Sequence, residues 1–187
     1  MNALVVAGVL LVILGISYQT GWSRSRNLVT TNGVSVHSRP QYHGTFTALW
    51  AMLPALAVVL LWAWFGGDIT RNYTVSLIPT DTVMSLDQMG LNNAINRINA
   101  LASGYGVTGE LAPYEQAAGD ALRSFNFITF AGSLILAIVA GGAGLLYARS
   151  QITARLRARN QVERAVNILL LACSAVAILT TVGIVAS

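Results

Sequence analysis

The sequence predicts an all-α integral membrane protein with four transmembrane helices and a small helical extracytoplasmic cap. Of its 187 residues, 55% are hydrophobic and only 10% are charged, whereas soluble domains carry about 25% charged residues. The charge is also unevenly distributed, because long stretches contain none. Uncharged apolar stretches of about 20 residues, separated by polar loops, are typical of membrane-spanning helices.

The first two predicted spans cover residues 3–18 and 46–65 and belong, with a basic cytoplasmic loop at residues 19–44, to the segment 1–66. No positive charge precedes the first span and no small-residue cleavage site follows it, so we expect a retained helix rather than a signal peptide. The second span has the 20 residues that a bilayer requires. We expect it to end at Gly66-Gly67-Asp68.

The connection 67–124 is long enough to form a small folded cap. Its apolar residues between positions 81 and 103 recur at roughly helical spacing and stop before Gly104, which predicts one helix. Pro113 suits the first turn of a second helix, which we expect to continue directly into the third span. We therefore predict a helical hairpin beside the membrane.

The third span covers residues 125–148, and the fourth covers residues 165–187 after a cytoplasmic loop at 149–164. Small residues four positions apart on the third span share one face and allow another helix to approach closely. We expect the fourth span to belong to a truncated chain, because the sequence stops without a polar flank. The small residues that we predict to pack against another helix are Ser133, Ala137 and Gly141, with Gly144 on the neighbouring row beside Ala140 and Ala148.

The distribution of arginine predicts the orientation. All eleven basic residues are arginines. The loop 19–44 has three arginines without an acid, the loop 149–164 has five against Glu163, and the connection 67–124 has three against six acids. The positive-inside rule therefore places both basic loops in the cytoplasm, and the cap and the N-terminus outside it. The arginines that we predict to set this topology are Arg24, Arg26, Arg39, Arg149, Arg155, Arg157, Arg159 and Arg164.

These arginines have a second interpretation, because an arginine-rich loop can also form a docking surface for a cytoplasmic partner. Contact with anionic lipid headgroups is the simpler interpretation. Either interpretation accounts for the basic charge, so we expect no nucleic acid partner.

Two glycine-rich motifs resemble nucleotide-binding sequences. Residues 104–109 match G-x-G-x-x-G, which binds dinucleotides only between a strand and a helix. Because a helix is predicted before it, we interpret this motif as a loop between two helices. Residues 141–144 lack the Gly-Lys-Ser/Thr of a phosphate-binding loop and predict a packing face.

Asn32-Gly33 could turn a hairpin, but we favour a helix that continues from the first span and is capped by Gly33.

The chain shows no pattern that predicts catalysis, a cofactor or a metal site. His37 and His43 lie six positions apart in a loop without Cys, Asp or Glu, so further metal ligands are missing. None of the four spans contains an acid or a base, although such residues usually mark an ion path. We therefore interpret the spans as a scaffold rather than as an enzyme or a complete conduction route.

Two stretches resemble a known family. The first comprises residues 24–26 (RSR), 37–44 (HSRPQYHG), 48–50 (ALW) and 53–56 (LPAL), and the second comprises residues 159–164 (RNQVER) and 169–183 (LLLACSAVAILTTVG). They resemble the N-terminal part of PstC, the permease subunit of the bacterial phosphate ABC importer. The resemblance implies a three-helix extension with an outer insertion, followed by the first helix of the permease core. The remaining core helices and their coupling loop do not appear here, so no site residue is carried over.

This resemblance leads to a functional hypothesis. We expect an anchoring part of a phosphate permease in the bacterial inner membrane, without a cofactor of its own. Its implied partners are the lipid bilayer, the remaining permease core, a second permease subunit, a cytoplasmic ATPase subunit and a periplasmic phosphate-binding protein. The alternative is a stand-alone membrane accessory or sensor protein that senses through the cap.

Overall fold

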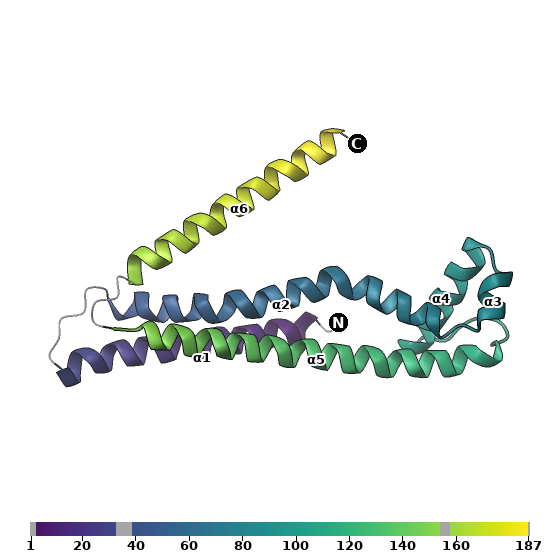
Figure 1. Cartoon of the computed structure of the whole chain (residues 1–187), viewed down its shortest axis with the longest axis horizontal. Helices are drawn as coiled ribbons and strands as arrows, with labels where there is room; N and C mark the ends of the chain where they lie inside the picture. The colour runs from purple at the N-terminus through teal and green to yellow at the C-terminus, as the bar shows by residue number, and fades with distance from the viewer. Residues whose placement is uncertain (1–2, 33–38, 154–157, 187) are drawn as a thin grey trace. The chain divides into compact units, whose positions relative to one another are not determined.

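The computed structural model describes residues 3–32, 39–153 and 158–186, and within these ranges it contains helices and no strand. The predicted all-α fold class is therefore confirmed. In chain order (Figure 1) the helices are α1 (Ala3–Asn32), α2 (Pro40–Ser76), α3 (Thr80–Ser85), α4 (Gln88–Ala102), α5 (Pro113–Gln151) and α6 (Ala158–Ala186).

Four of the helices in the described part of the chain, α1, α2, α5 and α6, are long and apolar enough to cross a membrane. The number of predicted spans is therefore confirmed. α2 has 37 residues and α5 has 39. At about 1.5 Å per residue each is longer than about 50 Å, well beyond the hydrocarbon core of about 30 Å. Part of each helix must therefore extend beyond the hydrocarbon core of a bilayer.

α2 does not end at Gly66-Gly67-Asp68, so this prediction is wrong. The helix continues for two and a half further turns to Ser76. Two glycines cost a helix about 1 kcal/mol each relative to alanine, and packing of the extension offsets this cost. Tyr73 stacks on Phe125 of α5 with 4.0 Å between ring centroids, and Thr74 is fully buried. Tertiary contacts thus override the local helix-breaking signal.

The chain divides into two compact units, of which the first comprises residues 57–137 and the second essentially residues 2–56 and 138–187. In the first unit, α3 and α4 pack beside the end of α2 and the start of α5 (Figure 1). We call residues 67–124 the cap. The buried core of the cap consists of Ile78, Ala94, Ile95, Ile98, Ala118 and Leu122.

The predicted single helix between residues 81 and 103 is interrupted. α3 ends at Ser85, Leu86 is extended, and α4 begins after Asp87. The Asp87 side chain accepts a hydrogen bond of 2.8 Å from the Gly90 backbone nitrogen. This is a helix N-cap, which satisfies one of the unpaired donors at a helix start. Asp87 therefore starts a new helix where the apolar spacing alone predicted continuity.

The second helix of the predicted hairpin forms as expected. α5 starts at Pro113 and continues without interruption through the third predicted span. Proline is favoured at the first position of a helix because its missing N–H has no helical partner there. The cap is thus joined to a membrane span by one continuous helix.

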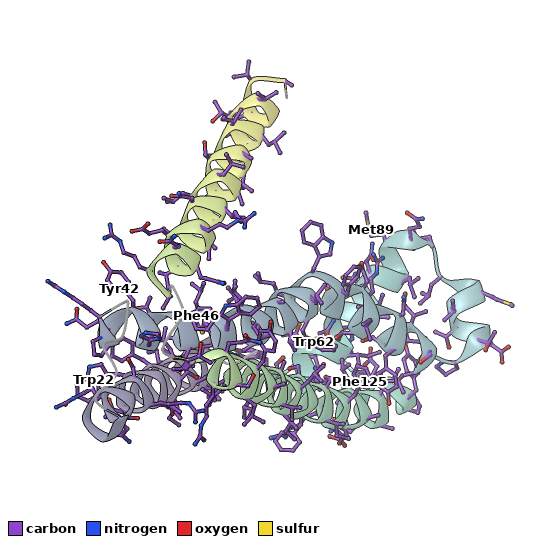
Figure 2. The ribbon with its side chains drawn as sticks, turned by 60° about the vertical axis from the view of Figure 1, so that its left-hand side comes forward. Trp22, Tyr42, Phe46, Trp62, Met89 and Phe125 are labelled. Atoms are coloured by element: carbon purple, nitrogen blue, oxygen red, sulfur yellow. The ribbon has the colours of Figure 1, made fainter. Side chains whose placement is uncertain are left out.

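In the second unit, an apolar cluster joins the start of α2, the end of α5 and the start of α6. It consists of Phe46, Ala148, Ala158 and Val162, with Tyr42 packed against it. Trp50 extends the cluster, because its ring lies 6.1 Å from that of Phe46. Figure 2 shows Phe46 and Tyr42 on α2. The end of α5 carries Arg149 and the start of α6 carries Arg159 and Arg164, so this cluster joins helix ends with three of the eight predicted arginines.

Candidate functional site

Small residues mediate the closest approach between helices of the second unit. A Cβ added at Gly144 of α5 would collide with the Trp50 carbonyl oxygen of α2 and lie 3.1 Å from the Ala51 Cα. At Gly141 an added Cβ would lie 3.2 Å from the Ile13 Cγ2. Gly144 therefore permits a backbone approach that a larger residue would prevent, whereas at Gly141 the neighbouring side chain would have to shift by only a few tenths of an ångström.

A second close approach joins α1 to α2. A Cβ at Gly21 would collide with the Thr47 Oγ1 and lie 2.6 Å from the His43 carbonyl oxygen. From the other side, a Cβ at Gly44 would lie 2.9 Å from the Tyr18 ring. Sequence reasoning missed this contact, although Ser17, Gly21 and Ser25 recur every four residues as small interface residues do.

The other small residues of α5 that we predicted at an interface have different surroundings. Ala137 is 1% exposed. Ser133 is half-buried and donates its hydroxyl hydrogen bond to the Phe130 carbonyl oxygen of its own helix at 2.8 Å. Ser133 belongs to the first unit, whereas Gly141 and Gly144 belong to the second.

The arginines of α1 and the following segment have unequal surroundings. Arg26 places its guanidinium 4.7 Å from the centre of the Trp22 ring, a cation–π contact that suits a membrane interface. Arg24 is half-buried, and its Nε has no hydrogen-bond partner in the described part of the chain. Arg39 is exposed.

At the end of α5 and the start of α6, Arg149 and Arg159 directly follow Ala148 and Ala158 of the Phe46 cluster. Arg149 and Arg164 are exposed. Arg159 donates to the Glu163 carboxylate at 2.6 Å between Nε and Oε1, one turn along α6. Arg155 and Arg157 lie outside the described residues. The arginines on α5 and α6 therefore belong to helix ends that one apolar cluster holds together.

Of the two histidines that we considered as metal ligands, the structure describes one. His43 is fully buried, and both of its ring nitrogens lack a hydrogen-bond partner among the described residues. His37 lies outside the described residues. Within the described ranges, no group of three or more His, Cys, Asp or Glu side chains could hold a metal ion.

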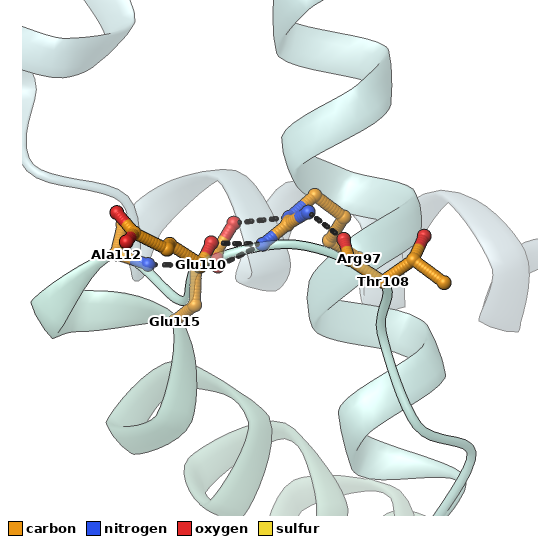
Figure 3. A network of polar contacts seen from close by, with 5 residues as sticks. All are labelled: Arg97, Thr108, Glu110, Ala112 and Glu115. Atoms are coloured by element: carbon orange, nitrogen blue, oxygen red, sulfur yellow. Dashed lines mark hydrogen bonds and ion pairs between the residues drawn. The ribbon is translucent and has the colours of Figure 1, made fainter.

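The most extensive polar network lies in the cap and was not predicted (Figure 3). Arg97 of α4 donates from Nε to Glu115 Oε1 at 2.7 Å and from Nη2 to Glu115 Oε2 at 2.8 Å. It also donates to the carbonyl oxygens of Thr108 at 3.0 Å and Glu110 at 2.8 Å. Arg97 therefore holds both α5 and the loop that precedes it.

Glu115 completes this network from the first turn of α5. Its Oε2 accepts a hydrogen bond of 3.0 Å from the Ala112 backbone nitrogen, as the acidic residue of a capping box does. The hydrogen bond from Arg97 lowers the pKa of Glu115, which burial on its own would raise. The carboxylate is thus held charged although the residue is only 4% exposed.

The network also explains the glycine-rich motif at residues 104–109. The motif lies between α4 and α5, which confirms the predicted loop between two helices. Gly104 and Gly109 have positive φ angles of 79° and 93°, which glycine adopts without steric cost. The loop is closed by Arg97 and lacks the preceding strand that a dinucleotide site requires.

Together, these features define a class of protein: an all-helical membrane protein whose spans pack through small residues and whose cap is fixed by one ion pair. Residues 7–180 match the family model described as "Phosphate ATP-binding cassette transporter". The chain belongs to this family, and it is therefore a transporter component rather than a catalytic enzyme. A comparison with curated proteins found no match. A comparison with solved structures found none either.

Proposed function

We propose that this chain is the N-terminal, membrane-anchoring part of a phosphate importer permease of the PstC kind. In this role it contributes to ATP-driven uptake of inorganic phosphate, while a separate cytoplasmic subunit hydrolyses ATP. The observation that carries the proposal is the family match over residues 7–180. The resemblance to the PstC family supports the more specific assignment to the N-terminal part of the permease subunit. It is carried by residues 24–26, 37–44, 48–50, 53–56, 159–164 and 169–183.

The distribution of charge supports an orientation with the cap on the outer side of the inner membrane. The two loops with eight of the eleven arginines contain one acid, whereas the cap contains six. Positive residues are retained on the cytoplasmic side. In this orientation the Phe46 cluster lies on the cytoplasmic side and the Arg97–Glu115 pair lies in the periplasm.

The exposed surface of α6 supports a role for this helix in bracing the permease core. After Ala165, its described residues are all exposed, including Leu171 at 74% and Ile184 at 76%. Near its start, Arg164 and Trp50 line a groove of about 560 Å³. An apolar helix with this much free surface offers an interface to the remaining permease core and the second permease subunit.

The cap supports contact with a periplasmic phosphate-binding protein. Met84 and Met89 are 81% and 76% exposed on α3 and α4, and Figure 2 shows Met89 on the cap. Exposed methionines suit an adaptable docking surface because their unbranched side chains repack easily. The Arg97 network holds α4, which carries Met89, to the start of α5.

Uptake and co-purification together test the proposal. The chain with an affinity tag is extracted from its native membrane in mild detergent, and phosphate uptake is measured in cells that lack the chain. We expect an ATPase subunit and a second permease subunit to co-purify, and uptake to fall when the chain is removed. Unchanged uptake, together with purification free of an ATPase, would contradict the proposal and favour a stand-alone accessory protein.

A further inference from the structure

A groove lined by several amide side chains as well as apolar residues opens between α2, α4 and α5 in the unit of residues 57–137. Its volume is about 780 Å³. Asn92, Asn96 and Asn99 of α4 line it, and their spacing of four and three residues places them on one helix face. Arg71 of α2 and Asn126 of α5 line the groove from the other helices. The groove therefore collects amide groups and one guanidinium from three helices.

A separate apolar furrow of about 370 Å³ lies between α2 and α5. Leu61 and Leu136 are among its lining residues. Trp62 and Thr129 line both the groove and the furrow, so the two spaces meet at these side chains. Figure 2 shows Trp62 on α2. An indole at the junction of a polar and an apolar space is typical of a membrane interface.

The polar and apolar ends follow the same order along both antiparallel helices. On α2 the lining runs from Val58 in the furrow to Arg71 in the groove. On α5 it runs from Leu136 in the furrow to Asn126 in the groove. The 13 residues from Val58 to Arg71 span about 20 Å, which is about half the thickness of a bilayer with its headgroup regions. The combined space therefore has the length and polarity gradient of one lipid in one leaflet.

We propose that this groove and furrow bind one anionic phospholipid of the phosphatidylglycerol type. Arg71 donates to the phosphodiester, the amides of Asn96 and Asn99 bond the headgroup hydroxyls, and one acyl chain lies in the furrow beside Leu61. Asparagine suits hydroxyl groups because it both donates and accepts. This inference goes beyond the transport role and needs only that α2 and α5 cross the membrane.

Charge selects the headgroup. Arg71 donates to the Asn92 Oδ1 at 3.3 Å, and the structure shows no ion pair for it among the described residues. The residues that line the groove, all of them described, include no acid. The ammonium of phosphatidylethanolamine would find no carboxylate here, whereas the net negative charge of phosphatidylglycerol faces an arginine whose charge is not neutralised.

Two substitutions with matched controls separate the headgroup from the acyl chain. Arg71→Gln removes the guanidinium, and Arg123→Gln removes another exposed cap arginine as its control. Gly132→Phe fills the furrow that Gly132 lines, and Gly142→Phe is its control on the same helix. An added Cβ meets no described atom within 4 Å at either glycine, so neither substitution creates a Cβ clash. Thermal unfolding in lipid-free detergent verifies that each variant is folded.

The measurement is native mass spectrometry of the full chain after reconstitution in vesicles of equal phosphatidylglycerol and phosphatidylethanolamine. We expect phosphatidylglycerol to be retained at least about fivefold over phosphatidylethanolamine, a preference that requires about 1 kcal/mol. Arg71→Gln abolishes the preference, Gly132→Phe abolishes retention of either lipid, and both controls behave like the parent chain.

Four results would overturn the proposal. The first is equal retention of both lipids by the parent chain, and the second is a preference that survives Arg71→Gln in a folded variant. The third is displacement of phosphatidylglycerol by millimolar inorganic phosphate, which would make the groove a site for the free anion. Photo-crosslinking from position 96 to another protein rather than to lipid would assign the groove to a protein interface instead.

Discussion

Arg97 and Glu115 form a bidentate ion pair between α4 and α5, with 2.7 Å between Nε and Oε1 and 2.8 Å between Nη2 and Oε2. The two residues are 18 positions apart in the sequence, and the loop between them contains two glycines with positive φ. Because Arg97 also bonds two carbonyl oxygens of this loop, one guanidinium fixes the start of α5, the end of the loop and the face of α4.

Loss of this guanidinium is expected to loosen the cap. In Arg97→Ala the Glu115 carboxylate stays buried without its partner, which costs about 1–3 kcal/mol. We expect faster cleavage by chymotrypsin after Tyr105, which is 73% exposed in the same loop. Arg123→Ala is the matched control, since Arg123 is an exposed arginine of the cap. Equal cleavage of both variants and the parent chain would show that the pair does not hold the loop.

The same pair predicts a dependence of stability on pH. Since Arg97 lowers the pKa of Glu115 in the folded cap, the folded state binds this proton less readily than the unfolded chain. The stabilisation is fully present above the unfolded value of about 4.3 and is lost as the pH falls through the lower folded pKa. Thermal unfolding between pH 3 and pH 7 measures this loss.

Glu115→Gln removes the titrating group and is expected to flatten this part of the pH profile. Glu110→Gln is its control, because Glu110 contributes its backbone carbonyl to Arg97 and keeps it after substitution. A Glu115→Gln profile as steep as that of the parent chain would assign the acid sensitivity to another carboxylate.

Packing of α5 against α2 is expected to depend on Gly144. Gly144→Leu forces a side chain against the Trp50 carbonyl oxygen and the Ala51 Cα, and overpacking of this kind costs about 1–3 kcal/mol. Gly142→Leu is the matched control, because an added Cβ there meets no described atom within 4 Å. The unfolding temperature in mild detergent should fall for Gly144→Leu alone. Equal unfolding temperatures would mean that the two helices do not approach at this position.

The contact between α1 and α2 gives a parallel test. Gly21→Val would collide with the Thr47 hydroxyl, whereas an added Cβ at Gly15 of the same helix meets no described atom within 4 Å. We expect Gly21→Val to reduce the fraction of chain that remains monodisperse after heating in detergent, and Gly15→Val to leave it unchanged. A larger loss for Gly15→Val would place the interface on another face of α1.

The sequence predicted the long helices because a span needs little more than length and the absence of charge. α5 starts at Pro113 as predicted, and the predicted loop at residues 104–109 contains two glycines with positive φ. The end of α2 was mispredicted because the helix-ending signal of Gly66 and Gly67 is local, while Tyr73 stacks on Phe125, which is 52 positions away in the sequence.

Two features were not predicted, for different reasons. One is the break between α3 and α4, and the other is the Arg97–Glu115 pair. Asp87 followed by Gly90 is a local N-cap signal that competes with the apolar spacing around it, and attention to it would have divided the predicted helix. Glu115 three positions after Ala112 is likewise a local sign of a helix start. Its pairing with Arg97 is not local, because it requires α4 to pack beside the start of α5.

The orientation of the cap tests the account most directly, because the proposed contacts with a cytoplasmic ATPase and a periplasmic binding protein depend on it. In a Cys173→Ser background, a cysteine replaces Tyr105 in the cap or Ser150 at the end of α5, and both positions are exposed. Intact cells are treated with a membrane-impermeant maleimide. We predict that Tyr105→Cys is labelled in intact cells and Ser150→Cys only after lysis. Labelling in the opposite order would invert the topology and contradict the assignment of the cap to the periplasm.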